Sequence, residues 1–209
     1  MLPRAILRHW KSLITATLIA VGLTSCGNGS FFGFGRDTRN KLIVSVPDQR
    51  LLLVRDGEPI KSYKVSTSKF GLGDKPGSNR TPTGHLRVAK KIGDGAPIGA
   101  VFKNRRPTGE VIQPNAPGRD PVVTRILWLK GQESRNRNTF CRTIYIHGTP
   151  EERRLGSPAS YGCIRMGSRD VADLFKRIGH GADVFVTRQS LKSGNASQQF
   201  SFANLWKGS

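Results

Sequence analysis

The stretch YIHGTPEERRLGSPASYGCIRM, residues 145–166, places one histidine after a β-type run and one cysteine inside a glycine-flanked turn. Cys163 follows His147 by 16 positions, a connection long enough to fold the cysteine back onto the histidine. A cysteine is a nucleophile only as its thiolate, and a nearby imidazole is the usual means of forming one. Gly148 and Gly162 permit close approach of the backbone. The spacing therefore makes His147 and Cys163 a candidate catalytic pair, with turn amides available to an oxyanion.

The rest of the sequence predicts a single, mainly β domain. A chain of 209 residues is long enough for one compact core with tails, and 24 glycines and 12 prolines favour turns over long helices. Seven runs have a strand pattern: 41–46, 50–55, 60–67, 85–93, 121–131, 138–148 and 182–187. The segment 94–120 is predicted as a long loop with at most a short element at 100–102, and such loops are commonly lids or binding loops.

One helix is predicted directly after the cysteine. The period of the apolar residues changes from two to about 3.6 after Met166. Four apolar residues fall at i, i+3, i+4 and i+7: Val171, Leu174, Phe175 and Ile178. Ser168 is the expected N-cap and Gly179 the expected stop.

Residues 1–25 have the pattern of an export signal. A basic start is followed by an apolar run, 13–23, that is too short for the ~20 residues of a membrane-spanning helix. The sequence LTSC at 23–26 resembles the bacterial lipobox, in which the cysteine, here Cys26, carries the lipid. The alternative is an ordinary signal peptide or short anchor with an incidental Cys26. The first reading predicts an exported lipoprotein that is held on a membrane and faces the periplasm or cell wall.

The composition also suggests how the rest of the chain is organised. Residues 26–40 are rich in glycine, polar residues and phenylalanine and are predicted as a tether. A folded domain is expected at 41–188, and a weakly patterned polar tail at 189–209.

The charge predicts an anionic partner. The chain carries +20, and because three basic and no acidic residues lie in 1–25, about +17 remains without that segment. Such a surplus attracts lipid headgroups and wall polymers, and it also permits a non-catalytic envelope-binding protein. We expect no nucleic-acid partner, because the basic residues are neither on a basic helix nor interleaved with aromatics.

Neither a metal site nor a second reactive thiol is predicted. The candidate ligands His85, His147, His180 and Cys163 lack paired-ligand spacing. Cys141 is expected on a strand, ~20 Å from His147 at 3.3 Å per residue, so it could not also bond a Cys163 that contacts His147. Cys141 is therefore predicted to be a buried free thiol.

Four motifs, in this order, resemble the YkuD-type L,D-transpeptidases, which rebuild peptidoglycan cross-links outside the cytoplasm. They are IVSVPDQRLLLVRDGE (43–58), RTPTG (80–84), IHGT (146–149) and SYGCIRM (160–166). The resemblance extends over roughly residues 41–187 and implies a YkuD-like β-sandwich or mixed sheet with one prominent helix.

The resemblance also implies residue roles. Cys163 would be the nucleophile, His147 the base that activates it, and Gly148 the source of a backbone carbonyl that orients the ring. Backbone amides at Gly162 and Cys163 would stabilise the oxyanion.

Three further residues of the last motif have implied roles or depart from the family. Arg165 would either steady the loop or meet a substrate carboxylate, and Ser160 would be a turn residue. Many members have a second histidine where this chain has Tyr161, so Tyr161 either replaces it through its hydroxyl or leaves only its backbone amide.

The implied reaction is attack of Cys163 on the L-centre of diaminopimelate in a stem tetrapeptide, with release of D-alanine and formation of a thioester. The acceptor would be a stem peptide, an envelope lipoprotein or a D-amino acid, whereas water would make the enzyme an L,D-carboxypeptidase. The family uses no metal or other cofactor, and carbapenems are expected to acylate the same thiolate.

Overall fold

The computed structural model describes residues 35–191, in which ten strands form one mixed sheet of order β4-β10-β1-β2-β3-β9-β8-β7-β5-β6. The strands are β1 Asn40–Ser45, β2 Arg50–Arg55, β3 Glu58–Ser66, β4 Gly84–Ile92, β5 Ala100–Lys103, β6 Arg106–Val111, β7 Val122–Gly131, β8 Tyr145–Gly148, β9 Ile164–Met166 and β10 Asp183–Thr187. The helical elements are α1 Ser168–Arg177 and two short 3₁₀ turns, η1 Ser134–Asn136 and η2 Glu152–Arg154. The predicted export signal, Cys26, most of the tether and most of the tail lie outside the described residues.

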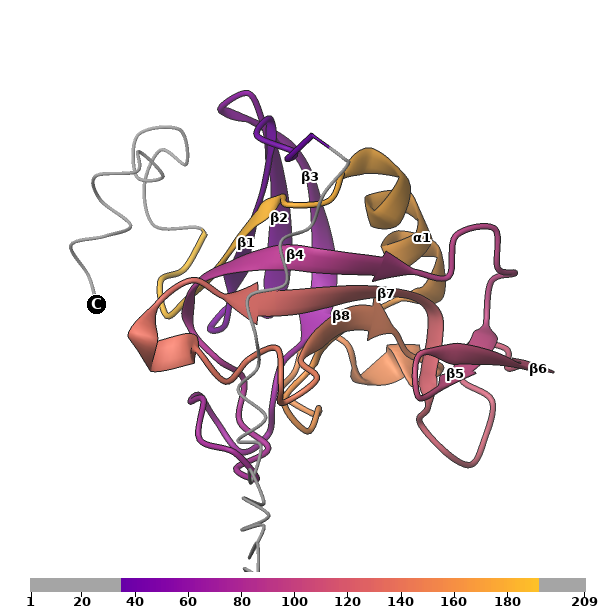
Figure 1. Cartoon of the computed structure of the whole chain (residues 1–209). Helices are drawn as coiled ribbons and strands as arrows, with labels where there is room; N and C mark the ends of the chain where they lie inside the picture. Colours follow the sequence, from indigo (N-terminus) through magenta and orange to yellow (C-terminus); the bar gives the residue numbers. More distant parts are fainter. Residues whose placement is uncertain (1–34, 192–209) are drawn as a thin grey trace, which may run out of the picture. The chain divides into compact units, whose positions relative to one another are not determined.

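Eight of the strands close on themselves, because β4 pairs with β7 as well as with β10. Figure 1 shows β4, β7 and β8 side by side, crossing β1, β2 and β3, while β10 and β9 join these two layers in the strand order. β5 and β6 continue the sheet beyond β7 and extend away from the layers. The prediction of a mainly β fold with one prominent helix is confirmed.

The core lies inside the closed sheet. Alternate residues of the strands face inward, which is why the strand runs carry apolar residues at every second position. The largest fully buried side chains include Leu42, Leu53, Leu86, Leu127 and Ile146, each at 0% exposure. At about 1.5–3 kcal/mol for each such side chain, this cluster is the main source of stability.

α1 adds its apolar face to the same core. Its buried residues follow the predicted spacing and pack with the strands: Val171, Leu174, Phe175 and Ile178 just beyond its end. Gly167, rather than Ser168, is the N-cap, and the Ser168 N–H donates instead to Glu152 Oε1 at 2.8 Å. Within the described part of the chain, no helix is long and apolar enough to cross a membrane.

A smaller apolar cluster lies on the outer face of β7 and β8. Ile126 and Tyr145 pack there with Ala100 and Phe102 of β5, and partly buried Cys163 contacts this cluster. Because the side chains of a strand alternate, these residues face away from the main core. The candidate nucleophile therefore lies on the outside of the closed sheet, beside β5.

Two predictions about the elements are wrong. The segment 94–120 contains β6 as well as β5, and the run predicted as a strand at 138–148 is a strand only from Tyr145 onward. Residues 138–143 form turns, and Thr143 has a φ of +54°, which non-glycine residues rarely adopt. β9 was also not anticipated, since its three residues continue directly from the Cys163 turn.

Candidate active site

The pairing of β8 with β9 determines where Cys163 lies. The two strands are parallel, with Ile146 opposite Ile164, so Cys163 lies level with Tyr145. The Tyr145 N–H donates to Cys163 Sγ at 3.4 Å, and the thiol donates to the Thr143 carbonyl at 3.6 Å. The sulfur is therefore held at the start of β8 by two backbone groups.

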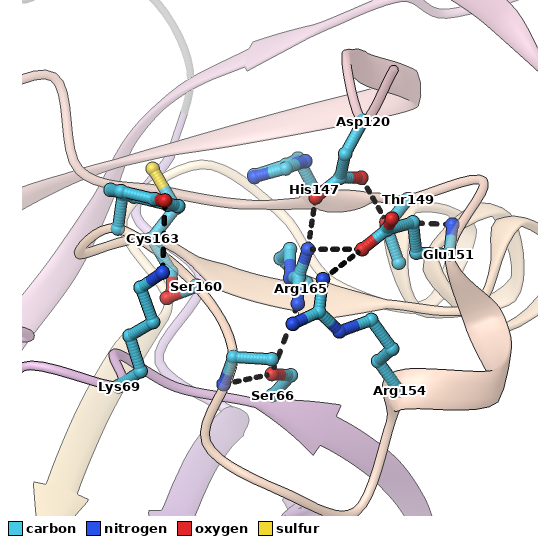
Figure 2. A network of polar contacts seen from close by, with 12 residues as sticks. Ser66, Lys69, Asp120, His147, Thr149, Glu151, Arg154, Ser160, Cys163 and Arg165 are labelled. Carbon is cyan, nitrogen blue, oxygen red and sulfur yellow. Dashed lines mark hydrogen bonds and ion pairs between the residues drawn. The ribbon is translucent and has the colours of Figure 1, made fainter. Parts of the chain in front are cut away.

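His147 lies on the same face of the sheet. His147 is two residues beyond Tyr145, the residue level with Cys163. Because neighbouring strands lie ~4.8 Å apart, this offset of two residues places the Cα atoms of His147 and Cys163 about 8 Å apart. Its ring extends toward the side of the site that holds the sulfur (Figure 2). Among the described residues, no hydrogen bond joins the ring to Sγ, because the thiol is directed to the Thr143 carbonyl.

The Gly148 carbonyl fixes the orientation of the His147 ring. It lies 2.8 Å from His147 Nδ1, and because a carbonyl only accepts, Nδ1 carries the proton and Nε2 is left as the basic nitrogen. Only glycine fits at position 148, since a Cβ there would lie 2.6 Å from the Val123 carbonyl oxygen. The structure thus places Gly148 where its implied role requires.

Burial keeps both members of the pair neutral. It raises the pKa of the Cys163 thiol to about 11, against the opposing influence of the Tyr145 N–H and of the Arg142 and Arg165 charges. Burial also lowers the pKa of His147, which is 5% exposed, although the Gly148 carbonyl favours the charged ring. At neutral pH the site therefore holds a thiol and a neutral imidazole that is able to accept a proton.

The turn before Cys163 is fixed from two sides. Ser160 Oγ donates to the Cys163 carbonyl at 2.6 Å and accepts from the Gly162 N–H at 3.3 Å. On the other side, the buried Thr81 hydroxyl donates to the Gly162 carbonyl at 3.0 Å. Gly162 itself has a φ of +119°, which side-chain-bearing residues rarely adopt. This arrangement explains why the RTPTG motif, which includes Thr81, belongs to the site.

Arg165 is engaged by protein groups. It is 4% exposed and forms ion pairs with Asp120 and, at 3.6 Å, with Glu151 (Figure 2). Asp120 also accepts from the Thr149 hydroxyl. Arg165 thereby connects β9 to the end of the long 94–120 segment, an arrangement that fits the loop-steadying role better than contact with a substrate carboxylate.

Arg142 is a second buried cation near the sulfur. Its side chain is 8% exposed, pairs with Asp74 at 3.1 Å and donates to the carbonyls of Gly73 (3.0 Å) and Arg80 (2.6 Å). It therefore holds the segment 73–80 against the site, and its charge favours the Cys163 thiolate. Sequence reasoning gave no role to Arg142 or Asp120, because their partners are far away in the chain and follow no period.

The prediction for Cys141 is wrong. Its side chain is exposed, it lies in a turn, and its sulfur takes part in a disulfide. The other described cysteine, Cys163, is free.

Comparison with known proteins shows the family. The sequence matches the YkuD family, the L,D-transpeptidase catalytic domain, over residues 39–186. The chain therefore belongs to the YkuD family. No curated protein matches the sequence.

Several solved structures resemble the fold. An L,D-transpeptidase from Mycobacterium smegmatis is 14% identical, with a TM-score of 0.46 over 71% of this chain and 58% of that one. One from Xylanimonas cellulosilytica is 16% identical, with a TM-score of 0.47 over 74% and 63%. L,D-transpeptidase 3 from Mycobacterium tuberculosis, in complex with a faropenem-derived adduct, is 15% identical, with a TM-score of 0.45 over 71% and 60%. The chain thus spans 58% to 63% of the length of these structures.

Proposed function

We propose that this protein is a peptidoglycan L,D-transpeptidase that works through a thioester at Cys163. The observation that carries the proposal is the shared face of Cys163 and His147, with Nδ1 of the ring fixed by the Gly148 carbonyl at 2.8 Å. Membership of the YkuD family supports stem peptides as the substrate class.

In the first half of the reaction, Cys163 Sγ attacks the carbonyl at the L-centre of diaminopimelate in a stem tetrapeptide. The thiol proton passes to Nε2 of His147, which requires the side chain of Cys163 to turn away from the Thr143 carbonyl. The carbonyl oxygen becomes an oxyanion beside the turn amide of Cys163, whereas the neighbouring Gly162 N–H must leave Ser160 Oγ before it can donate to the oxyanion. When the carbon–nitrogen bond breaks, D-alanine takes the proton from His147 and leaves, and the thioester remains.

In the second half, an amine attacks the thioester and gives its proton to His147. The carbon–sulfur bond breaks, an amide forms and Cys163 is protonated again. The neutral resting imidazole suits both halves, because it begins each of them able to accept a proton. An amine from a second stem peptide, an envelope lipoprotein or a D-amino acid would complete this step, whereas water would release a tripeptide.

Incubation of the full-length protein with disaccharide-tetrapeptides, followed by mass analysis, tests the reaction. Cross-linked dimers are the expected products. Accumulation of shortened monomers alone would show a carboxypeptidase, and failure to release D-alanine would contradict both reactions.

A second experiment tests the nucleophile with a carbapenem and intact-mass spectrometry. One covalent adduct is expected on the wild-type protein and on Cys141→Ala, and none on Cys163→Ala. An adduct on Cys163→Ala would contradict the assignment. The same variant decides between an enzyme and a basic envelope-binding protein, because a pure binding protein would lose nothing when Cys163 is replaced.

We further propose that the protein is exported and anchored through a lipid on Cys26. The basic start, the short apolar run and the LTSC sequence support this location. Membrane-extracted protein should show the added mass of the lipid, and its absence from membrane-extracted protein would refute the anchor.

A further inference from the structure

Lys69, Phe70 and Tyr161 form an exposed cluster beside the nucleophile, here called the Lys69 cluster. Tyr161, two residues before Cys163, is 62% exposed and Phe70 is 44% exposed. Their rings lie 5.3 Å apart and are tilted by 58°. Within residues 35–191, only five large hydrophobic side chains are exposed, and these two lie against each other at the candidate active site. Paired exposed aromatics commonly mark a binding surface.

The cluster is held in place by backbone contacts. The Lys69 N–H donates to the Ser160 carbonyl at 3.1 Å, and Ser68 forms a parallel bridge with Ser160. Thr81, which holds the Gly162 carbonyl, also accepts from the Ser68 N–H at 3.0 Å. The segment that carries Lys69 is therefore joined to the turn that carries Cys163, and a ligand would find the surface already formed.

The polar groups of the cluster can accommodate an anion. Lys69 Nζ donates to the Tyr161 hydroxyl oxygen at 2.9 Å and lies 4.4 Å from the centre of that ring. An ammonium group has three donors, and the phenol keeps its own hydrogen after accepting from Lys69. In the part of the chain that the structure describes, no carboxylate pairs with Lys69. Two ammonium hydrogens and the phenol hydrogen are thus left to donate to the same ligand.

We propose that Lys69 and the Tyr161 hydroxyl bind a carboxylate of the donor stem peptide, while the Phe70 and Tyr161 rings cover its aliphatic part. The inference rests on the proposed function, which supplies a substrate with free carboxylates close to the bond that Cys163 attacks. It also gives Tyr161 a use at the position where many relatives have histidine: the phenol binds substrate and takes no part in proton transfer.

The test compares a tetrapeptide acid with the same peptide in which all free carboxylates are amidated. For Lys69→Met, we expect KM for the acid to rise about fivefold with kcat nearly unchanged, as for one exposed charge-assisted hydrogen bond. The wild-type protein should show a similar penalty for the amidated peptide, and Lys69→Met should no longer distinguish the two peptides. Tyr161→Phe, which keeps the ring, should raise KM about twofold. Lys75→Met, a change at another exposed lysine on the same segment, is the matched control and should behave as wild type.

Two further measurements separate this inference from the reaction itself. Alkylation of Cys163 by neutral iodoacetamide should proceed at the same rate in every variant, because that reagent has no carboxylate. If the wild-type protein turns over neither peptide, the reaction proposal fails. The inference is then tested by equilibrium binding of the two peptides to Cys163→Ala and to the double variant Cys163→Ala/Lys69→Met. If the protein distinguishes the acid from the amide equally well with and without Lys69→Met, the inference is overturned. It is also overturned if Lys69→Met loses affinity only for a phosphate-rich wall polymer, because the cluster would then bind the polymer.

Discussion

At the scale of single residues, the candidate site combines a thiol and an imidazole that are both neutral at rest. Burial opposes a thiolate on Cys163 and an imidazolium on His147, so a separated ion pair is disfavoured before substrate arrives. In the proposed reaction the thiol proton has to be transferred when the sulfur attacks, so the turn that carries Cys163 must position the sulfur for this step. We therefore expect activity to depend on residues that position the turn as well as on the pair itself.

Thr81 is the clearest of these positioning residues. Replacing it by valine keeps the shape but removes the hydrogen bonds to the Ser68 N–H and the Gly162 carbonyl. Two buried backbone groups lose their partner, so we expect the free energy of unfolding to fall by about 1–3 kcal/mol, and kcat to fall by roughly tenfold as the turn loosens. Denaturant titration and steady-state kinetics measure the two effects. Thr83→Val is the control, since no hydrogen bond of that hydroxyl occurs within residues 35–191, and equal effects of both changes would exclude the role.

At the scale of elements, alternation predicted most of the strands but not all of them. β1 to β4, β7 and β10 carry apolar residues at every second position, because one of their faces lies on the core. β6 escaped prediction because all six of its residues are exposed and therefore carry no such alternation. The strand predicted at 138–148 begins late, because residues 138–143 form turns, and the Thr143 carbonyl accepts from the Cys163 thiol.

The residues of the candidate site were likewise only partly predictable from the sequence. His147 and Cys163 could be paired from their spacing and motifs, because both lie at the ends of one connection. Asp120 and Arg142 could not, since the ion pairs that give them a place form only after the long loops fold onto the sheet.

The pairing of Asp120 with Arg165 is the element-scale contact that is most open to test. It connects the end of the 94–120 segment to β9, and Arg165 is nearly inaccessible to solvent. Asp120→Asn removes the charge and leaves Arg165 with Glu151 at 3.6 Å. We expect the free energy of unfolding to fall by about 1–2 kcal/mol. This loss is smaller than for breaking a fully buried ion pair, because Asp120 is partly exposed. Amide hydrogen exchange should also become faster across residues 112–121.

Glu110→Gln provides the comparison for that experiment. Glu110 pairs with Arg119 on the surface, where both side chains are largely exposed. Such pairs contribute little, so neither stability nor exchange in residues 112–121 should change measurably. An Asp120→Asn protein with the exchange pattern of Glu110→Gln would show that the loop does not depend on Arg165.

At the scale of the whole domain, one carboxylate connects segments that are distant in the chain. Asp183 of β10 accepts from Arg36 at 2.8 Å, from His85 of β4 at 2.8 Å and from Arg87 at 3.2 Å. β10 lies between β1 and β4 in the closed sheet, so this cluster stabilises the position where the two layers are joined. Breaking it should weaken the domain as a unit instead of loosening one loop.

The pKa of Asp183 predicts how this contribution changes with acidity. Its hydrogen bonds and the nearby positive charges overcome the effect of burial and lower the pKa from 3.8 to about 2. A carboxyl group with a lowered pKa adds stability that is complete above pH 3.8 and is lost as the pH falls through about 2. From the difference in pKa, the wild-type protein should exceed Asp183→Asn by about 2 kcal/mol in free energy of unfolding at pH 6, with the two profiles converging near pH 2.

Denaturant titrations from pH 6 to pH 2 measure the difference, and Asp56→Asn, which breaks an exposed pair with Arg39, serves as the control. A difference between wild type and Asp183→Asn that stays constant from pH 6 to pH 2 would mean that Asp183 acts through packing and not through its charge.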